Sequence, residues 1–208
     1  MAIIEPFEKY YKEYDDWFIR NKDIYQAELG AIKTFIPKNK KGIEIGVGTG
    51  RFAINLGIKI GLEPSEKMAE ISRKKGIKVY KGVAEKLPFK NETFDFVLFV
   101  TTICFVDDLV ESFKESYRVL KTDGFIIIGF IDKESELGLK YQLKKEKSNF
   151  YKDANFYSVN NVLNFLRKTN FKNITIKQTV FPSQIDKLDC VKDGYGEGSF
   201  IIMKANKN

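Results

Sequence analysis

Apolar and polar positions along this chain switch repeatedly between the period of a helix and that of a strand. Helical spacing covers about 8–36, and Pro37 ends that region. Short apolar runs then predict strands over 42–46, a run ending at 63, 78–81, 94–100, 125–131, 173–179 and 200–204. Helices are predicted between them over 51–56, 66–75, from Asp107 or Asp108 to about 120, and 158–168. This alternation predicts an α/β fold with a doubly wound sheet, whose ligands bind outside the carboxyl ends of the strands.

Three glycines follow the first predicted strand at intervals of two. Gly46, Gly48 and Gly50 form a G-x-G-x-G pattern, whereas the dinucleotide fingerprint needs its third glycine where this chain has Arg51. The phosphate-loop signature is also absent. Glu63 ends the next apolar run, where a carboxylate could accept hydrogen bonds from both hydroxyls of a ribose. The pattern predicts a nucleoside-bearing cofactor that lies against bare loop backbone without a pyrophosphate.

Five segments in a fixed order carry a family resemblance. They are E-I-G-V-G-T-G at 44–50, G-L-E-P-S-E-K-M at 61–68, G-V-A-E-K-L-P-F at 82–89, F-D-F-V at 94–97 and Y-R-V-L-K-T-D-G at 117–124. Over about 41–130 the chain resembles the class I S-adenosylmethionine-dependent methyltransferases, in particular the small-molecule branch around the ubiquinone and menaquinone biosynthesis enzymes. The resemblance implies a Rossmann-like sheet of about seven strands, mostly parallel with an antiparallel last strand, and helices on both faces.

The same resemblance implies which residues bind S-adenosylmethionine. They are Glu44, Gly46, Val47, Gly48, Glu63, Pro64, Ser65, Met68, Ala84, Glu85 and Thr101. Glu44 would hold the amino-group end of the cofactor, and Glu63 would bind the ribose. Many relatives have Asp two places before Glu85, where this chain has Val83. Plainer interpretations stay open: Glu44 could pair with a lysine, Met68 could fill the core, and Glu85 could face solvent.

The acceptor side of the site is less determined by the sequence. Tyr11, Tyr14 and Trp17 lie on the N-terminal helical region, which in similar enzymes folds over the pocket, although such an aromatic stripe is more often core packing. Phe105, Tyr141, Tyr151 and the loop around 181–195 are further candidates for contact with the substrate. Asp15, Asp16 or a tyrosine could assist proton removal, but the spacing identifies no catalytic residue.

Composition narrows the chemistry. The chain has 208 residues, no histidine and two cysteines, Cys104 and Cys190. Catalysis by Ser-His-Asp or Cys-His groups is therefore excluded, and no metal site is expected. One domain is predicted, with an N-terminal helical lid over 1–40, a cofactor-binding core over 41–131, a cap over 132–157 and a closing helix and strands over 158–208. The sequence has no apolar run long enough to span a membrane and no signal-peptide pattern, so a reducing cytoplasm is expected.

A net charge of +7 raises the alternative of a nucleic-acid methyltransferase. Ten basic and four acidic residues fall in 133–177, which is more typical of a solvated face. The residues after the fourth predicted strand are Val-Thr-Thr-Ile at 100–103, not the Asn/Asp-Pro-Pro-aromatic motif used on flipped-out bases. A non-catalytic module that binds S-adenosylmethionine is the second alternative. We expect methyl transfer to a small-molecule acceptor by in-line displacement; the sequence sets neither the acceptor nor the oligomeric state.

Overall fold

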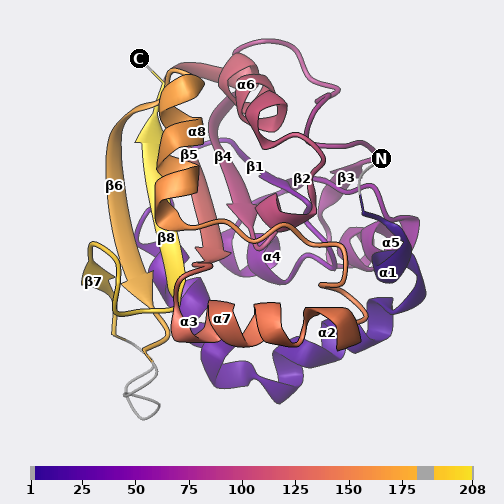
Figure 1. The fold of residues 1–208 in the computed structure, drawn as a ribbon. Helices are drawn as coiled ribbons and strands as arrows, with labels where there is room; N and C mark the ends of the chain where they lie inside the picture. Colours follow the sequence, from indigo (N-terminus) through magenta and orange to yellow (C-terminus); the bar gives the residue numbers. More distant parts are fainter. Residues whose placement is uncertain (1–2, 182–189, 208) are drawn as a thin grey trace.

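Eight strands form one sheet in the computed structural model, which describes residues 3–181 and 190–207 (Figure 1). In chain order they are β1 (Gly42–Ile45), β2 (Ile60–Leu62), β3 (Lys78–Tyr80), β4 (Phe94–Val100), β5 (Leu120–Ile131), β6 (Lys172–Thr179), β7 (Lys192–Asp193) and β8 (Phe200–Asn206). Their spatial order is β3-β2-β1-β4-β5-β8-β6-β7. Strands β1 to β5 pair in parallel, and β8 enters antiparallel between β5 and β6. The predicted Rossmann-like sheet is confirmed, and the two-residue β7 is a strand that the sequence did not reveal.

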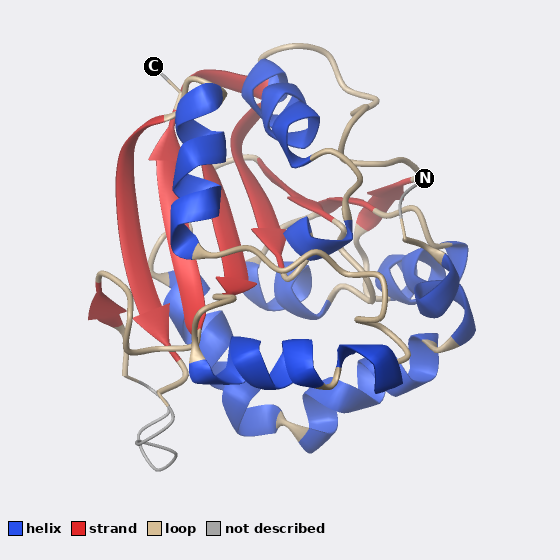
Figure 2. Ribbon diagram, in the orientation of Figure 1, coloured by secondary structure: helices blue, strands red, loops and turns tan. Residues whose placement is uncertain are grey.

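Helices cover both faces of this sheet (Figure 2). They are α1 (Glu5–Lys9), α2 (Tyr11–Arg20), α3 (Lys22–Lys33), α4 (Arg51–Leu56), α5 (Glu66–Lys74), α6 (Leu109–Val119), α7 (Glu136–Leu143) and α8 (Val159–Lys168), with short 3-10 turns η1 (Ile103–Phe105) and η2 (Lys145–Lys147). Helices α6 and α8 pack on one face, and α3 and α4 on the other. The N-terminal helical region is divided into three helices, because Tyr10 and Asn21 leave the helical conformation.

Side-chain caps fix where several of these helices begin. The Asp108 carboxylate accepts a hydrogen bond from the Glu111 N–H at the start of α6, and the Ser158 hydroxyl accepts one from Asn161 in a capping box at the start of α8. Both starts agree with the sequence prediction. Ser65 caps α5 in the same way by accepting the Met68 N–H. These caps fix the first residues of α5, α6 and α8, which come after β2, β4 and β5 in the chain.

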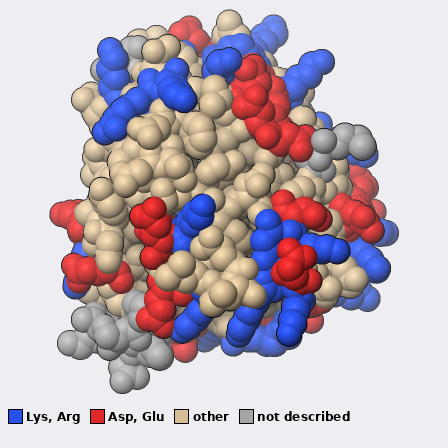
Figure 3. Space-filling view, viewed as in Figure 1, with Lys and Arg blue, Asp and Glu red and all other residues tan. Residues whose placement is uncertain are grey.

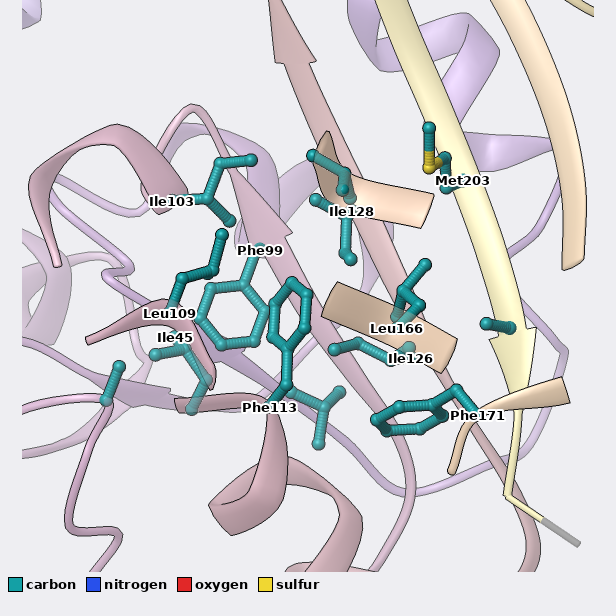
Figure 4. Packing of buried hydrophobic residues seen from close by; sticks show 14 of the residues in the cluster. Ile45, Phe99, Ile103, Leu109, Phe113, Ile126, Ile128, Leu166, Phe171 and Met203 are labelled. Carbon is teal, nitrogen blue, oxygen red and sulfur yellow. The ribbon is translucent and has the colours of Figure 1, made fainter. Parts of the chain in front are cut away.

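The larger core lies between the sheet and helices α6 and α8 (Figure 4). Strand β4 is buried along nearly its whole length, as expected for a central parallel strand covered on both faces. Strand β5 begins at Leu120, five residues earlier than predicted, because Leu120 already pairs with Phe94 before Phe125 pairs with Phe96. The intervening residues form an irregularity in which Asp123 takes a positive φ of 63°. A turn signal at 123–124 therefore lies inside an extended segment.

The burial of Phe113 in this core leads to a prediction about stability. Phe113 on α6 is fully buried against Phe99, so Phe113→Ala should lower the free energy of unfolding by about 3–5 kcal/mol. Leu143→Ala, also in a helix but at a side chain that is 87% exposed, should change it by less than about 0.5 kcal/mol. Urea denaturation of the two variants measures both values, and equal losses would contradict this description of the core.

Candidate functional site

A cavity of about 600 Å³ opens at the carboxyl ends of the central strands. Its wall includes Gly46 and Gly48 after β1, Glu63 after β2, Thr101 after β4 and Ile131 at the end of β5. Residues of α1, α2 and α7 line it from the other side, and Figure 1 shows α2 and α7 beneath the ends of β4 and β5. The volume lies within the range of about 300–1,000 Å³ that small-molecule sites occupy.

The glycine loop between β1 and α4 forms one wall of this cavity. Gly46 and Gly48 have φ values of +67° and +54°, a conformation that favours glycine. A Cβ atom at Gly46 would overlap the Thr102 side chain, and one at Gly48 would lie 3.4 Å from the Tyr14 hydroxyl. The loop is fixed at its start because the Leu62 carbonyl accepts the N–H groups of both Gly46 and Val47. Main-chain atoms therefore border the cavity at Gly46 and Gly48.

The Glu63 carboxylate connects this loop to the next one. One oxygen accepts the Gly48 N–H at 2.8 Å, and the other accepts the Ser65 N–H at 3.0 Å. Burial raises the pKa of Glu63 to about 7, although both hydrogen bonds act in the opposite direction. Each carboxylate oxygen can accept a second hydrogen bond, so the group remains able to bind donors from the cavity.

Glu44 is buried in β1 and supports the loop from within the fold. Burial raises its pKa well above the ordinary value, and the nearby Ala53 N–H acts in the opposite direction. The Oε2 atom has no hydrogen-bond partner among the described residues. The side chain does not line the cavity, so the structure places a buried, unused acceptor close behind the glycine loop.

The cavity gathers most of the residues predicted from the sequence. The cavity is lined by these members of the cofactor set: Gly46, Gly48, Glu63, Pro64, Met68, Ala84, Glu85 and Thr101. It is also lined by these acceptor candidates: Tyr14, Trp17, Phe105, Tyr141 and Tyr151. Four predicted residues lie elsewhere: Glu44, Val47, Ser65 and Tyr11. Val47 packs under Gly61, and Ser65 is fully buried as the α5 cap. Within the candidate loop around 181–195, residues 182–189 lie outside the described part of the chain.

Glu85 serves the fold as well as the cavity wall. Its carboxylate accepts the N–H groups of Asp107 at 2.8 Å and Asp108 at 3.2 Å, immediately before α6. The side chain thus holds the segment that follows η1. Because the Glu85 carboxylate already accepts these two bonds, we expect this motif to contact a ligand through the backbone near Ala84, which is buried and lines the cavity.

Hydrogen bonds and ion pairs hold the N-terminal helices over the glycine loop. The Asp15 carboxylate on α2 accepts hydrogen bonds from the Thr49 hydroxyl at 2.6 Å and from both the Nε and a terminal nitrogen of Arg51. On α1, the Glu8 carboxylate accepts the Glu66 N–H at the start of α5. Burial opposes ionisation of Asp15, but the hydrogen bonds from Arg51 and Thr49 hold its pKa below the ordinary value. Asp15 therefore anchors α2 and is poorly suited to remove a proton.

Several lining residues were not predicted from the sequence, and Glu28 on α3 is the most unusual. It is 4% exposed, lines the cavity, and has its pKa raised to about 8 by burial alone. The rings of Phe7, Phe18 and Phe150 extend the aromatic lining around it. Glu28 lies three positions after buried Tyr25 and four before buried Ile32, so helical spacing assigns it to the apolar stripe of α3. That spacing is the sequence signal that could have identified it.

Two negative findings limit the chemistry of the described residues. Over 3–181 and 190–207 there is no group of three or more acidic or cysteine side chains that could hold a metal ion. The same residues contain no helix that is long and apolar enough to cross a membrane. Cys104 and Cys190 are both free, and burial raises the pKa of Cys104 to about 12, so its thiol stays protonated.

Comparisons with known proteins agree with this geometry. The profile of a methyltransferase domain matches residues 43–128. An uncharacterized protein of Methanocaldococcus jannaschii is 51% identical over 97% of this chain and 98% of its own length. A crystal structure of an S-adenosylmethionine-dependent methyltransferase from Thermotoga maritima, described as a possible histamine N-methyltransferase, is 50% identical, with a TM-score of 0.94 over 98% of this chain and 99% of that one. A demethylmenaquinone methyltransferase of Staphylococcus aureus is 31% identical over 44% of this chain and 43% of its own.

The buried carboxyls predict how stability depends on pH. In the unfolded chain Glu28 ionises near its ordinary pKa of 4.5, whereas in the folded chain it stays protonated up to about pH 8. The folded state therefore binds the extra proton between these values, and stability falls as the pH rises from 4.5 to 8. Glu63, with a pKa of about 7, acts in the same direction. Glu28→Gln cannot ionise, so it should be a few kcal/mol more stable than the wild type at pH 8 and nearly equal at pH 4.5.

Chemical denaturation at pH 4.5, 6 and 8 checks this expectation. Glu70→Gln makes the same chemical change at an exposed position of α5 and should follow the wild type at every pH. An unchanged slope of stability against pH in Glu28→Gln would contradict the burial of an ionisable Glu28.

Proposed function

The chain belongs to the S-adenosylmethionine-dependent methyltransferases, and we propose that it transfers the methyl group to a small-molecule acceptor by in-line displacement. The observation that carries the proposal is the form of the site. A single cavity extends from the glycine loop and Glu63 to an aromatic region under α1, α2 and α7. It has room for a compact acceptor beside the cofactor, and helices cover it on the side away from the sheet.

The residues present suit S-adenosylmethionine. Glu63 would bind the ribose hydroxyls, the backbone at Gly46 and Gly48 would border the methionine portion, and Met68 and Ala84 would border the adenine. Glu44 does not line the cavity, so it would support the glycine loop from behind without contacting the cofactor directly. When bound, S-adenosylmethionine supplies a methyl group that is already electrophilic because it is attached to positively charged sulfur.

The contribution of the chain is then mainly alignment and exclusion of water. Reacting groups held in line can lower a barrier by roughly 7–11 kcal/mol without any catalytic acid or base. Asp15 and Glu8 hold α1 and α2 over the loop, so the cover is fixed by specific polar bonds as well as by packing. Residues 1–40 are proposed as the lid and 132–157 as the cap of one methyltransferase domain spanning 1–208. A protein without histidine can perform this chemistry.

Relatives support a small acceptor. The Thermotoga maritima protein is described as acting possibly on histamine, and the partial relative from Staphylococcus aureus acts on demethylmenaquinone. Both are small molecules, so the proposal extends their acceptor class to this chain. Two free cysteines fit a reducing compartment, and we place the enzyme in the cytoplasm on that basis.

Nucleic acid is the weaker alternative. Figure 3 shows acidic and basic side chains interspersed over the face that carries α7 and α8, without one broad basic area. An extended polyanion would favour such an area, since its affinity comes largely from phosphate contacts.

Release of S-adenosylhomocysteine tests the proposed function. Purified protein with S-adenosylmethionine is offered a panel of small amines, phenols, quinols and carboxylates, with histamine among them, and separately a panel of RNAs. Turnover with members of the first panel alone is the expected result. Turnover confined to RNA, or binding of the cofactor without any turnover, would overturn the proposal in favour of one of the two alternatives.

Glu63→Ala tests the assignment of the cofactor. Loss of a charged acceptor for two hydroxyls should weaken the binding of S-adenosylhomocysteine by about 10- to 100-fold. Titration calorimetry measures this, with Glu70→Ala on the exposed side of α5 as the matched control that should bind normally. Because Glu63 also accepts two loop N–H groups, a thermal melt must first establish that the variant is folded. Unchanged affinity in a folded variant would remove Glu63 from the cofactor site.

A further inference from the structure

The Glu28 carboxyl faces the cavity without a polar partner. Over residues 3–181 and 190–207 it forms no hydrogen bond and no ion pair, and burial is the sole cause of its raised pKa. Buried polar groups in proteins are almost always hydrogen-bonded, and buried charges are paired. A carboxyl that is 4% exposed, lines a cavity and has no partner is therefore suited to a ligand that brings its own hydrogen-bond donors.

Three phenol rings line the same cavity as this carboxyl: Tyr14 on α2, Tyr141 on α7 and Tyr151 after η2. Burial raises the pKa of these three tyrosines, and the Glu28 carboxylate raises it slightly further. The rings of Tyr141 and Tyr151 stack with centroids 5.1 Å apart, and Tyr151 stacks on Phe105 at 5.8 Å. Aromatic faces attract cations and pack against flat apolar groups. The surroundings of Glu28 therefore suit a cation that carries an apolar or aromatic body.

Among residues 3–181 and 190–207, no cationic side chain pairs with Glu28. Arg20, Lys144 and Lys147 also line the cavity, but all three are exposed, and none of them pairs with Glu28 in the described part of the chain. Positive side chains thus lie at the solvent side of the cavity, whereas the unpaired carboxyl is buried. This arrangement leaves an unpaired carboxyl within an aromatic enclosure, and that carboxyl would carry a negative charge once a cation paired with it.

We propose that the methyl acceptor is an amine with an aromatic or apolar body, and that its nitrogen binds the Glu28 carboxyl. This inference rests on the proposed function and deepens it by naming the substrate class. An acceptor of this kind would place its body among Phe105, Tyr141 and Tyr151 and its nitrogen toward α3. Glu28 is then the residue that binds the acceptor and removes its proton.

Proton removal is required because an alkylammonium has no lone pair with which to attack. The N–H bond of the ammonium breaks, its electron pair stays on nitrogen, and the proton passes to a carboxylate oxygen of Glu28. A neutral amine and a neutral carboxyl result, and both are tolerated in an apolar enclosure. An alkylamine has a pKa of roughly 10 in water. The raised pKa of Glu28 therefore reduces the difference in pKa between the proton donor and the proton acceptor.

The titration of Glu28 must be distinguished from that of the other titratable groups around the cavity. Glu63 has a pKa of about 7, and Glu44 is buried behind the glycine loop. Tyr14, Tyr141 and Tyr151 have pKa values raised by burial and stay neutral near pH 7. Asp15 stays ionised, and Arg20, Lys144 and Lys147 remain exposed at the rim. A pH profile alone therefore cannot identify Glu28, and the isosteric variant Glu28→Gln is needed.

Binding of matched probes tests the inference without turnover. Calorimetry at pH 7, with S-adenosylhomocysteine present, compares 2-phenylethylamine with 2-phenylethanol and 3-phenylpropionate. The amine should bind about 10- to 100-fold more tightly than either of the others. Before binding, the amine and Glu28 each carry one dissociable proton at pH 7. In the complex the pair carries only one, so binding should release nearly one proton. Titrations in phosphate and in Tris, which differ in heat of ionisation, measure that release.

The variants give the decisive comparison. Glu28→Gln should lose most of the amine affinity and the proton release, while its affinity for S-adenosylhomocysteine stays unchanged. With the best amine from the turnover panel, it should lower kcat/KM by about 10²- to 10⁴-fold. Glu70→Gln, exposed on α5, should match the wild type in all of these measurements.

Three outcomes would overturn the inference. Weaker binding of S-adenosylhomocysteine with normal amine binding in Glu28→Gln would assign this carboxyl to the cofactor. If alcohols or carboxylates were methylated and amines were not, the assignment of an amine as the acceptor would be wrong, and the proposed function would stand. Turnover of RNA with all small molecules inert would overturn the proposed function and, with it, the amine as acceptor.

Discussion

The hydrogen bonds of the Glu63 carboxylate are the interaction on which the site depends. Strands β1 and β2 pair in parallel, so the loops that follow them emerge at the same edge of the sheet. Glu63 joins these loops by accepting the N–H groups of Gly48 and Ser65. Buried backbone donors need acceptors, and this carboxylate supplies them to two segments at once. The shape of the glycine loop, and hence the wall of the cavity, follows from that pair of bonds.

The cavity region holds an unusual amount of buried acid. Glu28, Glu44 and Glu63 are each less than about a tenth exposed, and their charges together raise the pKa of Tyr14 beyond the effect of its own burial. Each buried carboxyl lowers the stability of the ligand-free fold at neutral pH, which is a common feature of binding sites. In a chain without histidine, burial brings the pKa values of Glu28 and Glu63 to about 8 and about 7, close to neutrality. Ligands that bring donors or positive charge would offset this loss.

The cover of the site uses acidic side chains in a second way. Seven acidic residues fall in 1–30, and two of them fasten helices to the core: Asp15 binds Thr49 and Arg51, and Glu8 binds the start of α5. Exposed ion pairs contribute little to stability, but Asp15 and Arg51 are half-buried and joined by several hydrogen bonds. Helices α1 and α2 are therefore held in place over the glycine loop, and their aromatic rings line the same cavity as Glu63.

Local chemistry allowed much of the fold to be read from the sequence. Apolar periodicity gave most strands, the caps at Asp108 and Ser158 gave two helix starts, and alternate glycines gave the turn after β1, because each depends on neighbours within a few residues. Tertiary contacts decided the rest. The early start of β5 depends on Leu120 pairing with Phe94. Tyr11 lies outside the cavity that Tyr14 and Trp17 line, and the bonds of Glu85 reach residues 22 and 23 positions later. Helical spacing could assign Glu28 to a buried stripe. Only the tertiary structure shows that no cation or donor from residues 3–181 and 190–207 meets it there, because that depends on every element packed around it.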